Sequence, residues 1–137
     1  MPAKIHVSPK PTALSINADY ASFRYDDRTI LLEVYFAVHP QSLSCNVSGG
    51  KRHSWVNLSL TLHDKSAGRP ILRDRVSMPV EVPDSVPAAQ TNMFVGKREY
   101  RMESGNYLLK ILAVDSLLSD RKDSITFELP ERPFSPT

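Results

Sequence analysis

The chain has 137 residues, of which 41% are hydrophobic and 23% charged, with 17 basic and 15 acidic side chains. This length is enough for one domain with a substantial core, and the composition is ordinary for a globular protein. Lys4 and Lys10 account for the excess positive charge, because residues 1–13 contain no acidic residue. The remainder is electrically balanced, which argues against a nucleic-acid-binding surface, and we expect no nucleic-acid partner.

Cysteine content and hydropathy bear on disulfides and on membrane insertion. Cys45 is the single cysteine, which excludes an internal disulfide. No apolar run approaches the roughly 18 residues of a membrane-spanning helix, so we expect no membrane insertion. Residues 1–6 also lack the apolar segment of a signal peptide.

The N-terminal part begins without any periodic pattern. Residues 1–14 contain three prolines, and we interpret them as an extended tail or an edge segment, with an edge strand near 5–8 as one form of it. Residues 18–25 are a candidate strand, followed by a turn. Residues 29–39 are rich in β-branched and aromatic side chains and predict a second strand that ends at Pro40. Its core-facing residues at period two are Leu32, Val34, Phe36 and Val38.

The middle of the chain predicts three further strands. Residues 41–52 are interpreted as a long connection. Residues 53–64 alternate regularly, residues 70–80 predict an edge strand because of Pro79, and residues 91–102 predict a strand broken at Gly96. The expected inward residues of the 53–64 strand are Val56, Leu58, Leu60 and Leu62.

The stretch 103–129 predicts a β-hairpin, and the rest of the fold is organised around it. Its first strand places Tyr107, Leu109, Ile111 and Ala113 on one face, and its second places Ile125, Phe127 and Leu129 inward. Such an apolar face needs a second sheet over it. Tyr107 follows a glycine turn, so it is either a corner tyrosine of an immunoglobulin-like domain or an ordinary core residue.

These elements together predict an all-β fold. About seven strands, regularly spaced turns and no helical periodicity indicate an immunoglobulin-like or fibronectin-III-like antiparallel β-sandwich. We place the domain at residues 15–131, with a C-terminal tail at 132–137.

No residue constellation indicates catalysis, a metal or a cofactor. Cys45 lies between His39 and His53, but the spacing matches no zinc pattern, so we expect a free loop thiol and two histidines at strand ends. The acidic residues of the last connection are expected to be solvated turn charges rather than calcium ligands. They are Asp115, Asp120 and Asp123.

Two surfaces are candidates for binding. Apolar residues that alternate with the core positions are expected to point outward, which is unusual when they form rows. These candidates for a protein interaction surface are Leu31, Tyr35, Leu108, Leu112 and Val114, with Ala37 beside them. If the assignment of inward and outward faces is reversed, the rows belong to the core. Trp55 is expected to be exposed and is the candidate platform for a sugar.

Several stretches match a family pattern in their order and spacing. They are D-Y-A-S-F-R-Y-D-D at 19–27, L-E-V-Y-F-A-V at 32–38, T-N-M-F-V-G at 91–96, S-G-N-Y-L-L-K-I-L-A-V-D-S at 104–116 and S-I-T-F-E-L-P at 124–130. The chain thereby resembles the N-terminal β-sandwich region of bacterial GWxTD-domain proteins, a family of exported proteins without an assigned function. The Gly-Trp-x-Thr-Asp motif itself is absent here, so no functional residue is carried over.

We therefore expect a non-catalytic module that mediates protein–protein or interdomain contacts, including self-association. The resemblance implies an exported or envelope-associated protein, in the periplasm or outside the cell. A carbohydrate-binding module that uses exposed aromatic rings is the alternative.

Overall fold

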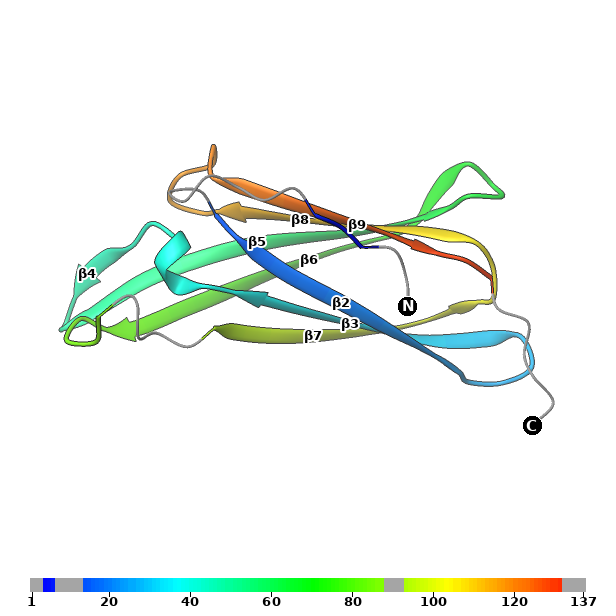
Figure 1. The fold of residues 1–137 in the computed structure, drawn as a ribbon, viewed down its shortest axis with the longest axis horizontal. Coiled ribbons are helices and arrows are strands. Elements are labelled where there is room, and N and C mark those ends of the chain that lie inside the picture. Colours follow the sequence, from blue (N-terminus) through cyan, green and yellow to red (C-terminus); the bar gives the residue numbers. More distant parts are fainter. Residues whose placement is uncertain (1–3, 7–13, 88–92, 132–137) are drawn as a thin grey trace.

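A computed structural model describes residues 4–6, 14–87 and 93–131. Within this part of the chain, the fold is two antiparallel β-sheets with one turn of 3-10 helix, η1 (Pro40–Ser42) (Figure 1). The strands are β1 (Lys4–His6), β2 (Ile16–Arg24), β3 (Thr29–Val38), β4 (Asn46–Ser48), β5 (Lys51–Asp64), β6 (Arg69–Pro83), β7 (Phe94–Glu103), β8 (Tyr107–Asp115) and β9 (Lys122–Leu129).

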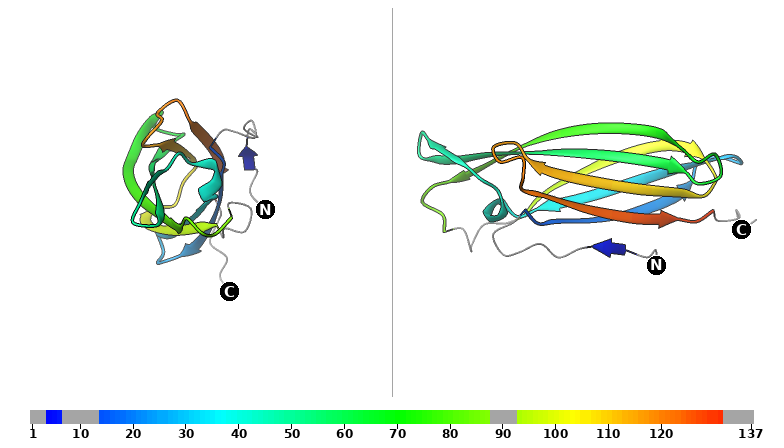
Figure 2. Two further views of the ribbon diagram at one scale, coloured as in Figure 1. Left: turned by 90° about the vertical axis from the view of Figure 1, so that its left-hand side faces the viewer. Right: turned by 90° about the horizontal axis from the view of Figure 1, so that it is seen from above.

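The two sheets have different sizes and lie face to face (Figure 2). The larger has the order β1-β9-β8-β5-β4, with β6 pairing along the other edge of β5. The smaller has the order β2-β3-β7. The predicted all-β class is therefore confirmed as a two-sheet antiparallel arrangement, consistent with a β-sandwich.

The seven long strands are the predicted ones, with small differences at their ends. β4 is a correction, because residues 41–52 were expected to be a connection only. Asn46–Ser48 instead folds back on Lys51–His53, and Gly49 and Gly50 make the turn with φ of 59° and 73°. Left-handed φ values of this kind favour glycine, which explains the Gly-Gly pair.

The core lies between the sheets and consists of the residues that alternation selected. The inward side chains of β3, β5, β8 and β9 are all buried and belong to one hydrophobic cluster. Ile111 lies opposite Leu60 on one side and Ile125 on the other, and all three are at most 1% exposed. Lys110 is exposed, so the predicted inward and outward assignment of β8 is correct.

Tyr107 closes the corner between the sheets. Its hydroxyl donates a 2.6 Å hydrogen bond to the carbonyl oxygen of Glu103, four residues upstream. A Cβ on Gly105 would lie 3.3 Å from that hydroxyl, so the glycine leaves room for the ring. This hydrogen bond resembles that of a corner tyrosine, and the ring, 4% exposed, is also part of the core.

Gly96 does not break its strand, contrary to the sequence-based expectation. β7 pairs with β3 without a register shift, and Gly96 lies directly opposite Phe36. A Cβ at position 96 would lie 2.3 Å from Cε2 of Phe36. The glycine therefore accommodates the aromatic ring across the strand pair rather than bending the strand.

Asp115 and Asp123 are buried and bond to backbone amides, so their expected role as solvated turn charges is wrong. Asp115 accepts hydrogen bonds from the amides of Ser44 (2.6 Å) and Leu117 (3.0 Å). Asp123 accepts them from Ile16 (3.1 Å) and Ser124 (2.9 Å). Each carboxylate thus ties the β8–β9 hairpin to a segment far away in the sequence.

The structure describes the two ends of the chain only in part. Leu14, the last residue of the expected tail, is fully buried in the core. β1 pairs with β9 at one edge of the larger sheet. The expected tail 132–137, the rest of 1–13 and residues 88–92 lie outside the described residues.

Candidate functional site

The predicted interaction residues fall on opposite sides of the molecule. Leu31 and Tyr35 lie on the outer face of the β2-β3-β7 sheet, here called the β3 face. Leu108, Leu112 and Val114 lie on the outer face of the larger sheet, here called the β8 face. Because the core separates the two faces, these residues form two separate surfaces rather than one.

The β3 face carries the more exposed apolar side chains. Tyr35 is 39% exposed, Phe23 on β2 is 50% exposed, and Val95 on β7 is 75% exposed. Strand register extends them into rows: Phe23 lies opposite Leu31, and Val95 lies opposite Ala37. Sequence reasoning missed Phe23 and Val95, although alternation within their own strands indicates their outward direction.

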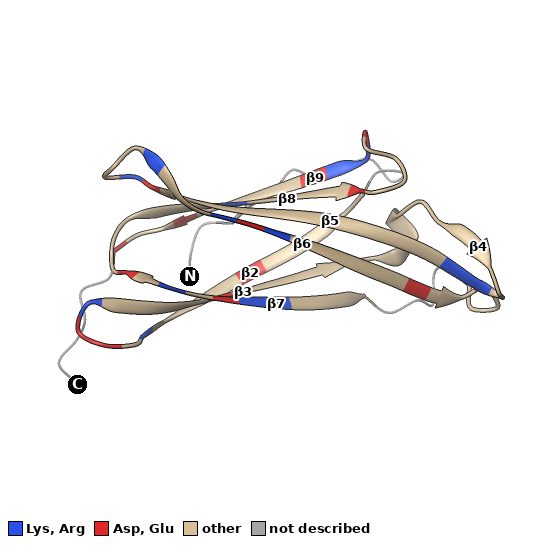
Figure 3. Cartoon of the chain, turned by 180° about the vertical axis from the view of Figure 1, so that it is seen from behind, with Lys and Arg blue, Asp and Glu red and all other residues tan. Residues whose placement is uncertain are grey.

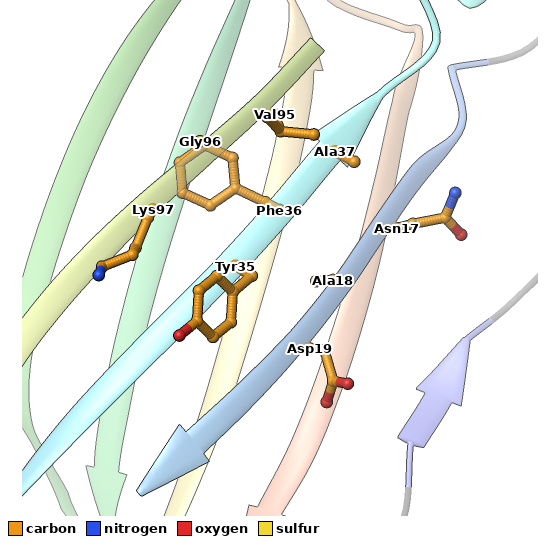
Figure 4. Close-up of a pocket in the computed structure, with 9 residues that line it drawn as sticks. All are labelled: Asn17, Ala18, Asp19, Tyr35, Phe36, Ala37, Val95, Gly96 and Lys97. Atoms are coloured by element: carbon orange, nitrogen blue, oxygen red, sulfur yellow. The ribbon is translucent and has the colours of Figure 1, made fainter. Parts of the chain in front are cut away.

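A shallow open hollow of about 640 Å³ lies on the β3 face (Figure 4). It exists because the small outward side chain of Ala37 lies between the larger outward side chains of Tyr35 and Val95. Its lining comes from all three strands: Asn17, Ala18, Asp19, Tyr35, Phe36, Ala37, Val95, Gly96 and Lys97. The hollow thus combines an apolar end at Val95 with polar groups at its other rim.

A charged network fixes the polar rim of the hollow. The hydroxyl of Tyr35 donates to Oε2 of Glu33 at 2.6 Å, and Nζ of Lys97 lies 3.0 Å from the same oxygen and 2.8 Å from Oε1 of Glu99. The Tyr35 hydrogen bond lowers the pKa of Glu33, and the bonds to Glu99 and Glu33 raise the pKa of Lys97. Glu33 and Lys97 are therefore both charged at neutral pH, and Tyr35 is held in one orientation.

The β8 face exposes less apolar surface than expected. Leu108, Leu112 and Val114 are only partly exposed. Leu112 lies between Ser59 and Ser124 in the register, so small polar residues flank it on both sides. The apolar row is consequently interrupted across the strands, and the β3 face is the better candidate for protein contact.

Trp55 lies on the β8 face, close to the start of β5. It is 38% exposed, and its ring stacks on that of His53 with centroids 6.5 Å apart and an angle of 20°. Pro79 lies opposite Trp55 on β6, and Nδ1 of His53 is 3.3 Å from Oε1 of Glu81. This end of β5 thus presents two nearly parallel rings with a carboxylate beside them.

The other chemical candidates do not assemble. Cys45 is exposed, and Nε2 of His53 lies 3.2 Å from the carbonyl oxygen of Ser48. In the described ranges, no group of three His, Cys, Asp or Glu residues is placed to hold a metal ion. The same part of the chain contains no helix of the length and apolarity needed to cross a membrane.

Comparison with known proteins gives no family. No family model matches the chain, and no curated protein matches it. Among solved structures, it is similar to two crystal structures of a β-glucosidase from Kluyveromyces marxianus, one selenomethionine-labelled and one in complex with glucose, at 13% identity and a TM-score of 0.26 in both cases. The match covers 86% of this chain but only 14% of the β-glucosidase chain, and it carries no argument about function.

Proposed function

We propose that this chain is a non-catalytic β-sandwich module that makes protein contacts through its β3 face. The observation that supports the proposal is the exposure of Tyr35 and Val95 at one hollow, with Phe23 exposed further along the same face. Exposed apolar side chains gathered at a hollow are typical of interaction sites. The ordered Glu33–Tyr35–Lys97 network would supply directional polar contacts at the rim.

We also propose that the sandwich is immunoglobulin-like or fibronectin-III-like. The corner geometry of Tyr107 supports this assignment, because such a tyrosine opens the penultimate strand of those domains. The resemblance to GWxTD-domain proteins supports an exported or envelope-associated setting, in which the module would contact a neighbouring domain or another protein.

Site-specific photocrosslinking tests the contact function. A photoreactive amino acid at Val95, in the cells that produce the protein, is expected to give one discrete adduct that mass spectrometry identifies. The same amino acid at Lys110, an exposed position of the β8 face, is the matched control. Ala37→Glu fills the hollow and is expected to abolish the Val95 adduct. The proposal is wrong if position 95 gives no adduct, or gives the same products as position 110.

A carbohydrate-binding function has a specific observation in its favour, the stacked pair of Trp55 and His53. Exposed aromatic rings bind the apolar faces of sugars, and Glu81 offers a hydrogen-bond acceptor beside them. A glycan array with the wild type and Trp55→Ala decides the matter. Hits that disappear in the variant support sugar binding by Trp55. An empty array, or hits that the variant retains, would contradict it.

A further inference from the structure

β7 is an edge strand with a regular free edge in the described structure. It pairs with β3 alone, over ten residues, with no register shift and no proline. β6, the neighbouring edge of the larger sheet, contains Pro70, Pro79 and Pro83 and has an irregularity opposite Leu62 and His63. Proline and irregular pairing protect an edge from further strands, so β6 is protected in a way that β7 is not.

The outward side chains of β7 alternate in charge along the strand. They are Lys97, Glu99, Arg101 and Glu103, and charged positions of both signs are visible along β7 in Figure 3. Such charges oppose pairing with an apolar strand. They favour a partner strand whose charges are complementary in the same register.

We propose that β7 pairs antiparallel with β7 of a second copy of this chain. Opposed residues of an antiparallel pair point to the same side, so outward residues must face outward residues. When the two-fold axis passes through Tyr100, Lys97 opposes Glu103 of the copy and Glu99 opposes Arg101. Every outward charge between 97 and 103 then has an opposite charge across from it.

The neighbouring registers pair fewer opposite charges. A two-fold axis at Glu99 places that carboxylate opposite its own copy and Lys97 opposite Arg101. An axis at Arg101 places two guanidinium groups together and Glu99 opposite Glu103. An axis at Arg98 pairs Lys97 with Glu99, but it leaves Arg101 opposite Val95 and brings Arg98 against itself. An axis at Met102 pairs only Arg101 with Glu103. The charges of β7 thus favour the register centred on Tyr100, which pairs all four outward charges between 97 and 103.

Existing contacts keep three of these charges on the outer face of the sheet. The guanidinium carbon of Arg101 lies 4.2 Å from the centroid of the Tyr25 ring, which orients Arg101 along the outer face. Lys97 and Glu99 hold each other at 2.8 Å, and each side chain is about half exposed. Pairing would join both smaller sheets into one continuous sheet and make the two β3 faces contiguous.

This inference deepens the proposed contact function by naming a partner, and charge-swap variants test it. Sedimentation velocity of the full chain over a concentration series is expected to show a monomer–dimer equilibrium. Glu99→Lys alone, or Arg101→Glu alone, places like charges across the pair and is expected to weaken dimerisation by roughly tenfold or more. An equimolar mixture of these two variants, or a chain with both changes, is expected to dimerise as the wild type does.

Two controls make the outcome decisive. Lys110→Glu changes a charge on the opposite face and is expected to leave the equilibrium unchanged. Carbodiimide cross-linking of mixed unlabelled and ¹⁵N-labelled wild type needs no variant, and it is expected to join Lys97 of one copy to Glu103 of the other.

A wild type that stays monomeric, single variants that dimerise normally, or a mixture that fails to rescue would each overturn the β7 pairing. Since the photocrosslink at Val95 requires no dimer, its success alongside a monomeric chain would leave the contact function intact.

Discussion

Ile111 and Lys110 are adjacent side chains with opposite surroundings. Ile111 is fully buried between Leu60 and Ile125, whereas Lys110 is exposed. We expect Ile111→Ala to lower the free energy of unfolding by about 2–5 kcal/mol, because it removes buried methyl groups and leaves a cavity. Lys110→Ala should change it by less than about 0.5 kcal/mol. Urea denaturation measures the stability of both variants. Equal losses would contradict the assignment of Ile111 to the inner face and Lys110 to the outer face of β8.

Gly96 is the residue whose role depends most closely on a single neighbour. A Cβ at this position would lie 2.3 Å and 2.7 Å from two ring carbons of Phe36, whose side chain is buried. We expect Gly96→Ala to cost about 1–3 kcal/mol through overpacking. The loss should be smaller in a Phe36→Leu background, because the ring is then gone. A double-mutant cycle measures this coupling, and simple additivity would show that the clash is not the cause.

At the scale of elements, buried carboxylates fasten the β8–β9 hairpin to the rest of the domain. The two oxygens of Asp115 accept separate hydrogen bonds, from Ser44 on one side and Leu117 on the other. Asp115→Asn replaces one acceptor by a donor that faces an N–H group. We expect a loss of about 1–3 kcal/mol by denaturation, whereas the exposed Asp120→Asn should be nearly neutral. Equal behaviour of the two variants would mean that this fastening does not contribute.

The open edge between the sheets is bridged by a side-chain hydrogen bond from β7 to β6. The hydroxyl of Tyr100 donates to Oδ2 of Asp74 at 2.7 Å, and burial followed by this hydrogen bond raises the pKa of Tyr100 well above its usual range. The neutral phenol is therefore favoured in the folded state. The raised pKa contributes to the free energy of unfolding in full below pH about 10, the ordinary pKa of a tyrosine. This contribution is lost as the pH rises further.

Comparison with Tyr100→Phe isolates that contribution. The difference in unfolding free energy between wild type and variant is expected to shrink as the pH rises above about 10. Absorbance of the phenolate in the folded protein should also show one fewer late-titrating tyrosine in the variant. A difference that is constant across this pH range would exclude the bridge as a source of alkaline sensitivity.

At the scale of the whole molecule, the long strands could be predicted because their pattern is local. Alternation in β8 alone identifies Leu109 and Ile111 as core residues. Gly96 could not be assigned, because its reason is a ring on a strand 60 positions earlier in the chain. The burial of Asp115 and Asp123 could not be predicted for the same reason. The amide of Ser44 lies 71 residues from Asp115, and the amide of Ile16 lies 107 residues from Asp123. The hollow of the β3 face also depends on three strands that meet only in the fold.

Both sheets contribute to a single hydrophobic cluster, and this predicts one cooperative unfolding transition. Leu32 lies on the smaller sheet and is fully buried, whereas Trp55 lies on the larger sheet and reports its environment by fluorescence. A three-stranded sheet whose apolar face loses its cover is not stable alone. Leu32→Ala should therefore shift the Trp55 fluorescence transition and the far-ultraviolet circular dichroism transition together, by about 2–5 kcal/mol. If the fluorescence midpoint stayed at the wild-type value while part of the dichroism was lost earlier, the two sheets would be separate folding units.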